Sequence, residues 1–231
     1  MFEKVTKIRG VVMKMKSNTG NVIRLSVAQA LSMTTMNVNI INTALVGSLL
    51  SPVPWLATLG LSLQFVASML TTLPASLLMV RFGRRRVFMA GVLVAAGATC
   101  TQGVAILSMN FVLFCLASMC LGIAQGCAGF YRYAAADSAE ESQKPRAISY
   151  VLAGGLLAAF FGPEIARNAV GLVPGHLYAG CYFSIALLQV FSLLTLNGID
   201  IPKPNRTRVG GRPIQAFFKM PIFVVGTITA A

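Results

Sequence analysis

Charged residues are scarce in this sequence, and acidic residues are the scarcest of them. Only 11% of the 231 residues are charged, with 19 Lys or Arg against 6 Asp or Glu, whereas 56% are hydrophobic and the mean hydropathy is +0.74. A water-soluble domain usually carries about 25% charged residues. The composition therefore excludes a soluble fold and predicts a protein that lies in a membrane.

The side chains that build catalytic and metal sites are also few. There is one histidine, His176, and the five cysteines lie inside apolar runs without a CxxC spacing. Ser62 is followed by Leu63 instead of the glycine of a serine-nucleophile motif, and His176 falls in a predicted loop away from it. The sequence also lacks the G-x-x-x-x-G-K-[S/T] loop that binds ATP. We therefore expect no enzymatic activity, no catalytic residue, no metal and no cofactor.

Long charge-free runs predict the number of membrane spans. They cover 56 residues between Arg24 and Arg81, 45 between Arg86 and Arg132, and 32 between Arg167 and Asp200. A single membrane helix needs about 20 apolar residues, so each of the first two runs can hold two helices and a turn. We expect six spans, at about 25–48, 56–79, 87–107, 111–131, 147–167 and 177–197.

The predicted fold class is an all-α membrane protein of six transmembrane helices and a truncated seventh. A new apolar segment begins near residue 220 and continues to Ala231, which is too short to span a bilayer. The expected organisation is a basic N-terminal segment (1–24), a six-helix unit (25–197), a polar linker (198–219) and the start of helix seven (220–231). The stretch 134–146 is predicted to be a cytoplasmic loop.

The basic residues predict the orientation of the chain. If the chain crosses the bilayer six times, 18 of the 19 Lys and Arg lie on one side and only Arg167 lies opposite. Basic residues concentrate on the cytoplasmic side of membrane proteins. We therefore expect a cytoplasmic N-terminus, a multi-pass location in the cell inner membrane, contact with anionic membrane lipid, and no nucleic-acid partner.

The turn between the second and third spans carries a recognisable motif. Its residues Arg81, Gly83, Arg84, Arg85 and Arg86 resemble the loop G-x-L-x-D-R-x-G-R-R-R of the major facilitator superfamily. Two positions depart from that loop, because Ser76 replaces its first glycine and Val80 its aspartate.

Two further segments are similar to motifs of the same family. The segment from Gly122 to Gly129 is similar to the pattern R-x-x-Q-G-x-G-A, with Gln125 and Gly126 in place and Gly122 in place of the arginine, and Gly162-Pro163 matches the centre of an antiporter motif. The resemblance implies the amino-terminal half of a twelve-helix carrier, built from two inverted three-helix repeats.

The resemblance also implies a function. It predicts a secondary transporter that moves a small solute by alternating access, and proton-coupled efflux is one mode of such transport. The partner for this motion would be a C-terminal six-helix half that is missing from the sequence. The alternative is a six-helix half without transport activity of its own. The motifs leave the solute, the direction and the coupling ion open.

Polar residues inside the predicted spans are the candidate solute contacts. Asn39 and Asn42 lie on one face of the first span, Gln64 lies in the second and Gln125 in the fourth. Such residues avoid lipid, so they either line a cavity or form interhelical hydrogen bonds, and both interpretations stay open. The glycines of the fourth and fifth spans, with Pro163, are expected mainly to let helices pack closely.

Glu164 is the one acidic residue within a predicted span. It precedes Arg167 by three residues, a spacing that permits an ion pair on one helix face. The pair is either a proton-coupling site or a structural salt bridge near the outer end of the fifth span.

Overall fold

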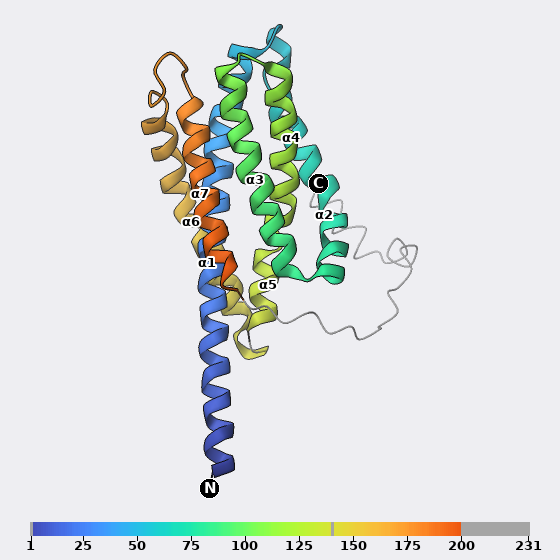
Figure 1. Cartoon of the computed structure of the whole chain (residues 1–231), viewed down its shortest axis with the longest axis vertical. Coiled ribbons are helices and arrows are strands. Elements are labelled where there is room, and N and C mark those ends of the chain that lie inside the picture. Colours follow the sequence, from blue (N-terminus) through green and yellow to red (C-terminus); the bar gives the residue numbers. More distant parts are fainter. Residues whose placement is uncertain (1, 140, 200–231) are drawn as a thin grey trace.

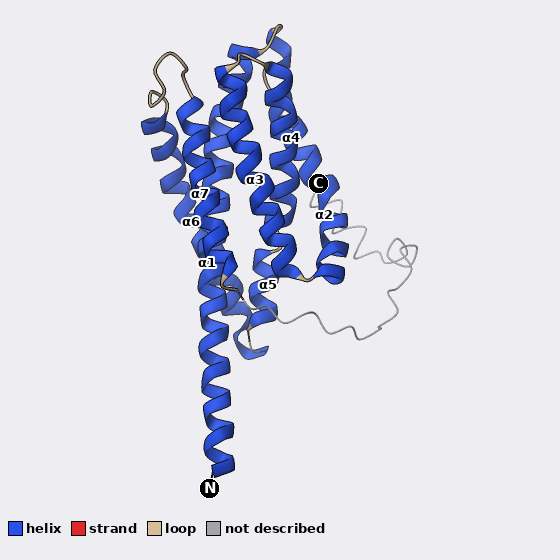
Figure 2. Cartoon of the chain, viewed as in Figure 1, coloured by secondary structure: helices blue, strands red, loops and turns tan. Residues whose placement is uncertain are grey.

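A computed structural model of the chain describes residues 2–139 and 141–199, with side chains from residue 20 onward. Every regular element in these two ranges is a helix, which confirms the all-α prediction for this part of the chain (Figure 2). The helices pack in one bundle, and the first part of α1 extends beyond it (Figure 1). The elements are α1 (Phe2–Leu50), η1 (Pro54–Leu56), α2 (Leu59–Phe82), α3 (Arg84–Leu107), α4 (Phe111–Ala128), α5 (Tyr131–Ser138), η2 (Glu141–Gln143), α6 (Lys144–Ala169) and α7 (Ala179–Asn197), of which η1 and η2 are short 3-10 helices.

Proline, glycine and asparagine set the ends of the helices. α1 ends just before Pro52, because proline lacks the backbone N–H that would continue it. Gly83 alone separates α2 from α3, and its φ of 90° lies in the region that glycine adopts at no steric cost. At the other end of α3, Asn110 caps α4 by accepting a hydrogen bond from the backbone N–H of Leu113 at 3.0 Å. The chain therefore reverses direction within a few residues at both ends of α3.

One predicted loop differs from the structure. α1 is continuous from Phe2, so segment 1–24 and the first predicted span share one helix, and the division between them stays a prediction. The predicted loop 134–146 is wrong in part, because α5 continues to Ser138 and α6 begins at Lys144. Three consecutive alanines from Ala134 favour helix, and Pro145 suits the first turn of α6.

Several helices are long and apolar enough to cross a membrane, which makes the chain a multi-pass membrane protein. The described residues contain five such segments, at Pro54–Phe82, Arg84–Leu107, Phe111–Ser138, Glu141–Ala169 and Ala179–Asn197. α1 is not among them because three asparagines (Asn37, Asn39 and Asn42) dilute its apolar half. The sixth span stays a prediction. The expected linker and seventh helix lie outside the described residues, apart from Gly198 and Ile199.

Three of the four most extensive helix contacts join helices that are not consecutive in the chain. α1 packs along α6, α2 along α4, and α3 against both α7 and α4. One apolar cluster, near the end where α2 meets α3, contains Phe88 and Tyr131 with their rings 4.7 Å apart. A second cluster, near the opposite end, contains Phe114 and Tyr182 with their rings 5.7 Å apart. Polar side chains occupy the level between the two clusters.

Glycines permit the closest of these helix contacts. At Gly122 an added Cβ would collide with the backbone carbonyl of Gln64 in α2, and at Gly126 it would come 2.8 Å from the carbonyl of Ser68. Gly154 likewise lies against the backbone of Ser26, and this brings α6 onto α1. Small residues let helix backbones approach where lipid supplies no hydrophobic driving force.

Enlarging Gly122 should separate α4 from α2. We expect Gly122→Leu to lower the free energy of unfolding by about 1–3 kcal/mol, because the new side chain has no space. Unfolding of the purified chain in mixed detergent micelles measures this. The matched control is Gly97→Leu in α3, where an added Cβ meets nothing within 4 Å. Equal stability of the two variants would contradict the packing argument.

Candidate functional site

A network of uncharged polar side chains joins four helices in the interior of the bundle. Asn39 of α1 donates a hydrogen bond to the side-chain oxygen of Gln64 in α2, and Gln64 Nε2 donates to Gln125 Oε1 in α4 at 2.9 Å. Gln102 Nε2 of α3 reaches Asn39 Oδ1 at 3.2 Å and Ser118 Oγ of α4 at 3.0 Å. Four of these side chains are fully buried and Gln125 is half-buried.

Two atoms of this amide network have no hydrogen-bond partner among the described residues, namely Gln102 Oε1 and Gln125 Nε2. A buried polar group without a partner costs about 1–3 kcal/mol, and a carboxamide offers both donor and acceptor atoms. Both atoms are buried, and Gln125 is the residue of the two that also borders a cleft.

Gln125 also borders a small cleft between α1 and α4. The cleft has a volume of about 10 Å³, close to the space of one water molecule, and residues of α3, α5 and α7 also line it. Its polar lining comes from Ser32, Thr35, Gln125 and Gln189, and Gln189 Nε2 donates to Thr35 Oγ1 at 2.8 Å. Among the described lining residues, Tyr131 is the one ionisable group.

Asn42, the other α1 candidate, lies one turn farther along the helix and is directed elsewhere. It is buried, and its Nδ2 donates to the carbonyl of Val38 in its own helix at 3.0 Å. The adjacent Thr43 hydroxyl lies 3.3 Å from the hydroxyl of Tyr182 in α7. This end of α1 is therefore bound to α7, apart from the amide network.

Glu164 and Arg167 form an ion pair on the exposed side of α6. Arg167 Nη2 lies 2.9 and 3.1 Å from the two carboxylate oxygens, and Asn168 Nδ2 donates to Oε1 at 2.6 Å. The two side chains are 57% and 75% exposed, so neither reaches the amide network in the interior.

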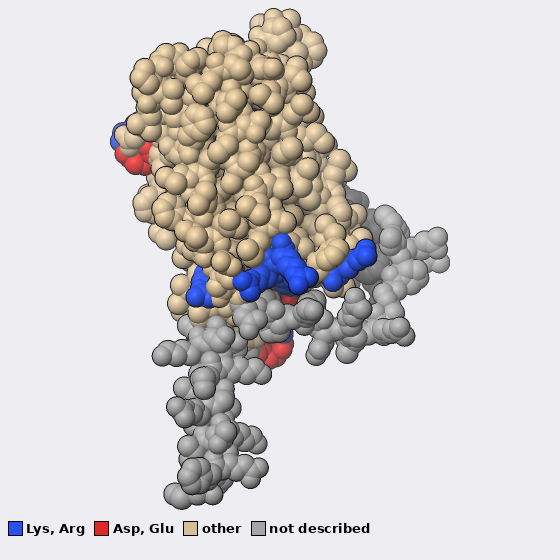
Figure 3. Space-filling model, viewed as in Figure 1, with Lys and Arg blue, Asp and Glu red and all other residues tan. Residues whose placement is uncertain are grey.

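The arginine-rich turn binds the ends of two other helices. Arg84 forms an ion pair with Asp137 of α5, and Arg85 donates to the backbone carbonyl of Asn197 and, at 3.0 Å, to its Oδ1. A cation at the C-terminus of α7 also interacts favourably with the helix dipole. Arg81 lies over the ring of Phe82 at 5.3 Å. In Figure 3 the basic side chains gather at this end of the bundle.

The structure brings together three of the sequence candidates, because Asn39, Gln64 and Gln125 bond in series. Sequence reasoning did not identify Gln102 and Gln189. In the sequence, each of the two is a lone glutamine inside an apolar run, and that is the one feature that could have indicated it.

The glycine candidates differ in their surroundings. Gly162 lies against the Asn37 side chain of α1, where an added Cβ would come 2.7 Å from the asparagine Cβ, and Pro163 follows it inside α6. Gly122 and Gly126 contact α2, whereas an added Cβ at Gly129 would meet only its own helix. Close helix contact therefore involves three of the four glycines.

Removing the Gln64 carboxamide should leave Asn39 Nδ2 and Gln125 Oε1 without these partners. We expect Gln64→Leu to lower the free energy of unfolding by about 1–3 kcal/mol. The measurement is unfolding in mixed micelles, with Thr101→Val as the control because that exposed hydroxyl bonds only within α3 in the described structure. A Gln64→Leu variant as stable as the control would show that the network adds nothing to stability.

The Arg84–Asp137 pair should matter more than the other ion pair at this end. The Arg84 side chain is only 16% exposed, so Asp137→Asn leaves a largely buried cation without its partner and should cost about 1 kcal/mol or more. Glu141→Gln breaks the open Lys144–Glu141 pair, whose carboxylate is 90% exposed, and should cost under about 0.5 kcal/mol. Thermal unfolding compares the two, and the reverse order would contradict the burial argument.

An apolar helical bundle with carboxamides inside and basic residues at one end is the architecture of a multi-pass membrane protein. Residues 25–231 match the family model of the Major Facilitator Superfamily, so the chain belongs to that family. This confirms the resemblance carried by the turn between α2 and α3. The chain is also similar to the riboflavin transporter RfnT of Brucella anthropi, with 36% identity over 209 residues. That match covers 89% of this chain and 52% of the relative, so the chain spans about half of the relative's length.

Proposed function

We propose that the chain forms the amino-terminal six-helix half of a secondary transporter for a small neutral solute, with riboflavin as the first candidate. The observation that carries the proposal is the half-buried carboxamide of Gln125, which has an unpartnered N–H group beside the cleft between α1 and α4. Membership of the family supports transport, and the name of the Brucella relative supports the solute.

The helix contacts support two inverted three-helix repeats. In this arrangement α1 crosses the membrane too, in addition to the five candidate spans. If α1, α2 and α3 exchange places with α4, α6 and α7, the α1–α6 contact becomes the α4–α2 contact and the α3–α7 contact becomes itself. These are the most extensive contacts of the bundle. Each helix and the helix that replaces it in this exchange run in opposite directions. Inverted repeats of this kind occur in carriers that rock around a site near mid-membrane.

The chemistry of the cleft suits an uncharged solute that forms many hydrogen bonds. Riboflavin carries hydroxyl groups and a heteroaromatic ring with carbonyl and N–H edges, and carboxamides can both donate to and accept from such groups. The described cleft residues include no carboxylate, lysine or arginine that would select an ion. Because the cleft itself holds about one water, the second six-helix half must supply the rest of the solute site.

The proposed orientation follows from the charges. Within the described residues, the basic ends of α2, α3, α5 and α6 lie at the end of the bundle where the turn between α2 and α3 lies, and Arg167 lies toward the other end. By the positive-inside rule we propose a cytoplasmic N-terminus, and the bacterial relative supports a location in a bacterial inner membrane.

Glu164 remains the proton-coupling candidate, with Arg167 as its partner. The exposed ion pair also fits a structural role, and Glu164→Gln separates the two: loss of the pH dependence of transport supports coupling, and unchanged pH dependence supports a structural pair. The alternative is that the chain has no partner half. A six-helix half alone would have no transport activity of its own.

The test measures riboflavin flux by fluorescence in sealed vesicles. The chain is fused to the C-terminal half of the Brucella carrier and compared with the chain alone. We expect flux from the fusion only, and Gln125→Leu should raise its KM about threefold to tenfold through loss of one hydrogen bond, while Thr101→Val should not. A well-inserted fusion that moves no riboflavin above empty vesicles would overturn the proposed solute.

A further inference from the structure

A large groove lies between α1 and α6 in the described part of the chain. It has a volume of about 1060 Å³ and is lined by α1, α6 and Leu188 of α7, with residues preceding α6 at one end, while α2, α3 and α4 contribute nothing to it. The cleft at Gln125 contains none of the groove residues. The groove is therefore separate from the proposed solute site.

The walls of the groove are apolar side chains that the described protein leaves uncovered. Ile23 of α1 is 59% exposed, and Leu157 and Phe161 of α6 are 54% and 58% exposed. Its two hydroxyls from α1, Ser26 and Thr34, already donate to carbonyls of their own helix at 2.9 and 2.8 Å. The α1 wall thus offers surface for hydrocarbon, and its two hydroxyl hydrogens are already donated within the helix.

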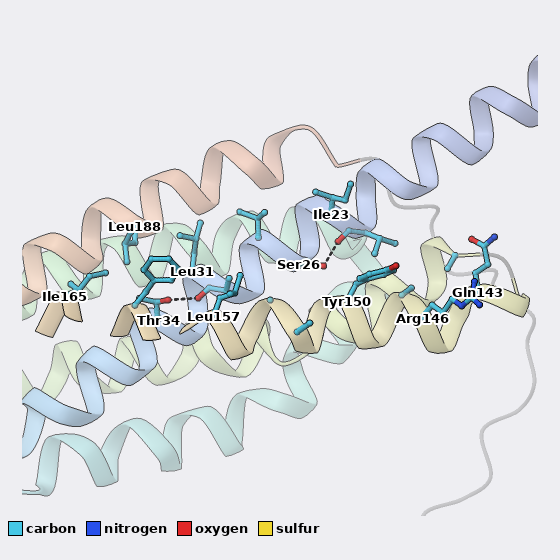
Figure 4. Close-up of a pocket in the computed structure, with 18 residues that line it drawn as sticks. Ile23, Ser26, Leu31, Thr34, Gln143, Arg146, Tyr150, Leu157, Ile165 and Leu188 are labelled. Carbon is cyan, nitrogen blue, oxygen red and sulfur yellow. Dashed lines mark hydrogen bonds between the residues drawn. The ribbon is translucent and has the colours of Figure 1, made fainter. Parts of the chain in front are cut away.

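The polar groups of the groove gather at one end. Figure 4 shows Gln143, Arg146 and Tyr150 together at that end, with Ile165 and Leu188 at the other. Arg146 is exposed and makes no ion pair with any described residue, whereas Lys144 beside it is paired with Glu141 at 2.6 Å. The described lining includes no carboxylate. This end has an uncompensated positive charge.

The dimensions match one leaflet of a bilayer. Arg146 and Leu157 are eleven residues apart on α6, which corresponds to about 16 Å at 1.5 Å per residue. That is about half of the ~30 Å hydrocarbon core, so Leu157 lies near mid-membrane when Arg146 lies at headgroup level. Tyr150, one turn from Arg146, is of the residue type that lies at the membrane–water interface.

We propose that this groove binds one anionic glycerophospholipid from the leaflet at the basic end of the bundle. Arg146 and Gln143 bind the headgroup phosphate, and an acyl chain lies along Tyr150, Leu157 and Phe161 against α1. Basic pockets between membrane helices bind anionic headgroups in this way. A zwitterionic lipid fits less well because no described carboxylate of the groove faces its ammonium group.

Native mass spectrometry of the delipidated 231-residue chain tests the headgroup site. We expect one phosphatidylglycerol to be retained at a lower concentration than phosphatidylcholine. Arg146→Gln should raise the half-saturating concentration of phosphatidylglycerol about fivefold and leave that of phosphatidylcholine unchanged. Arg132→Gln is the matched control, because Arg132 is an exposed arginine of α5 outside the groove. Equal retention of both lipids, or no effect of Arg146→Gln, would overturn the headgroup site.

A second pair of variants tests the acyl-chain site. Ala153 is exposed and lines the groove, so Ala153→Trp should fill it and abolish retention of phosphatidylglycerol. Ala159→Trp, at an exposed α6 position outside the groove, should not. Retention that survives Ala153→Trp would place the lipid elsewhere, and a chain that retains no phospholipid would mean that something else covers the groove. No solute is present, so these results stand apart from the riboflavin test.

Discussion

The interior of a bilayer supplies no hydrogen-bond partners, and the rest of this structure depends on that constraint. Each carboxamide within an apolar helix must find its partners inside the protein, in its own helix or in another. The amide network meets this demand with side chains from α1, α2, α3 and α4. Sliding one of these helices by a turn, about 5.4 Å, would break several bonds together. The network therefore fixes the relative heights of four helices, which apolar packing alone specifies weakly.

Close packing and hydrogen bonding meet at one residue of α2. The backbone of Gln64 lies against Gly122, and its side chain bridges Asn39 and Gln125. The hydrogen bond between the side chains of Gln64 and Gln125 can form because Gly122 lets the backbones of α2 and α4 approach. A larger residue at 122 would thus act on the polar interior as well as on helix spacing.

Most of the helices and part of the polar interior could be predicted from the sequence, because the signals for them are local. Charge-free runs and prolines are local signals, so the C-terminal end of α1, the start of α4 and the tight turns around Gly83 and Asn110 could be predicted. Partners across the bundle are not local: Gln189 bonds Thr35 from 154 residues away. Nothing near a lone glutamine in an apolar run indicates where its partner lies. The helix α5 was missed because its charged residues resemble those of a loop.

The packing of α1 against α6 has a consequence for how the protein is made. Asn37 of α1 donates to the carbonyl of Ala158, which is synthesised 121 residues later. At about 5–20 residues per second, the ribosome needs on the order of ten seconds to produce that stretch. During this interval α1 has left the ribosome, but α6, which accepts the hydrogen bond of Asn37, has not. A newly made α1 therefore depends on temporary shelter, from the insertion machinery or from neighbouring helices, until α6 arrives.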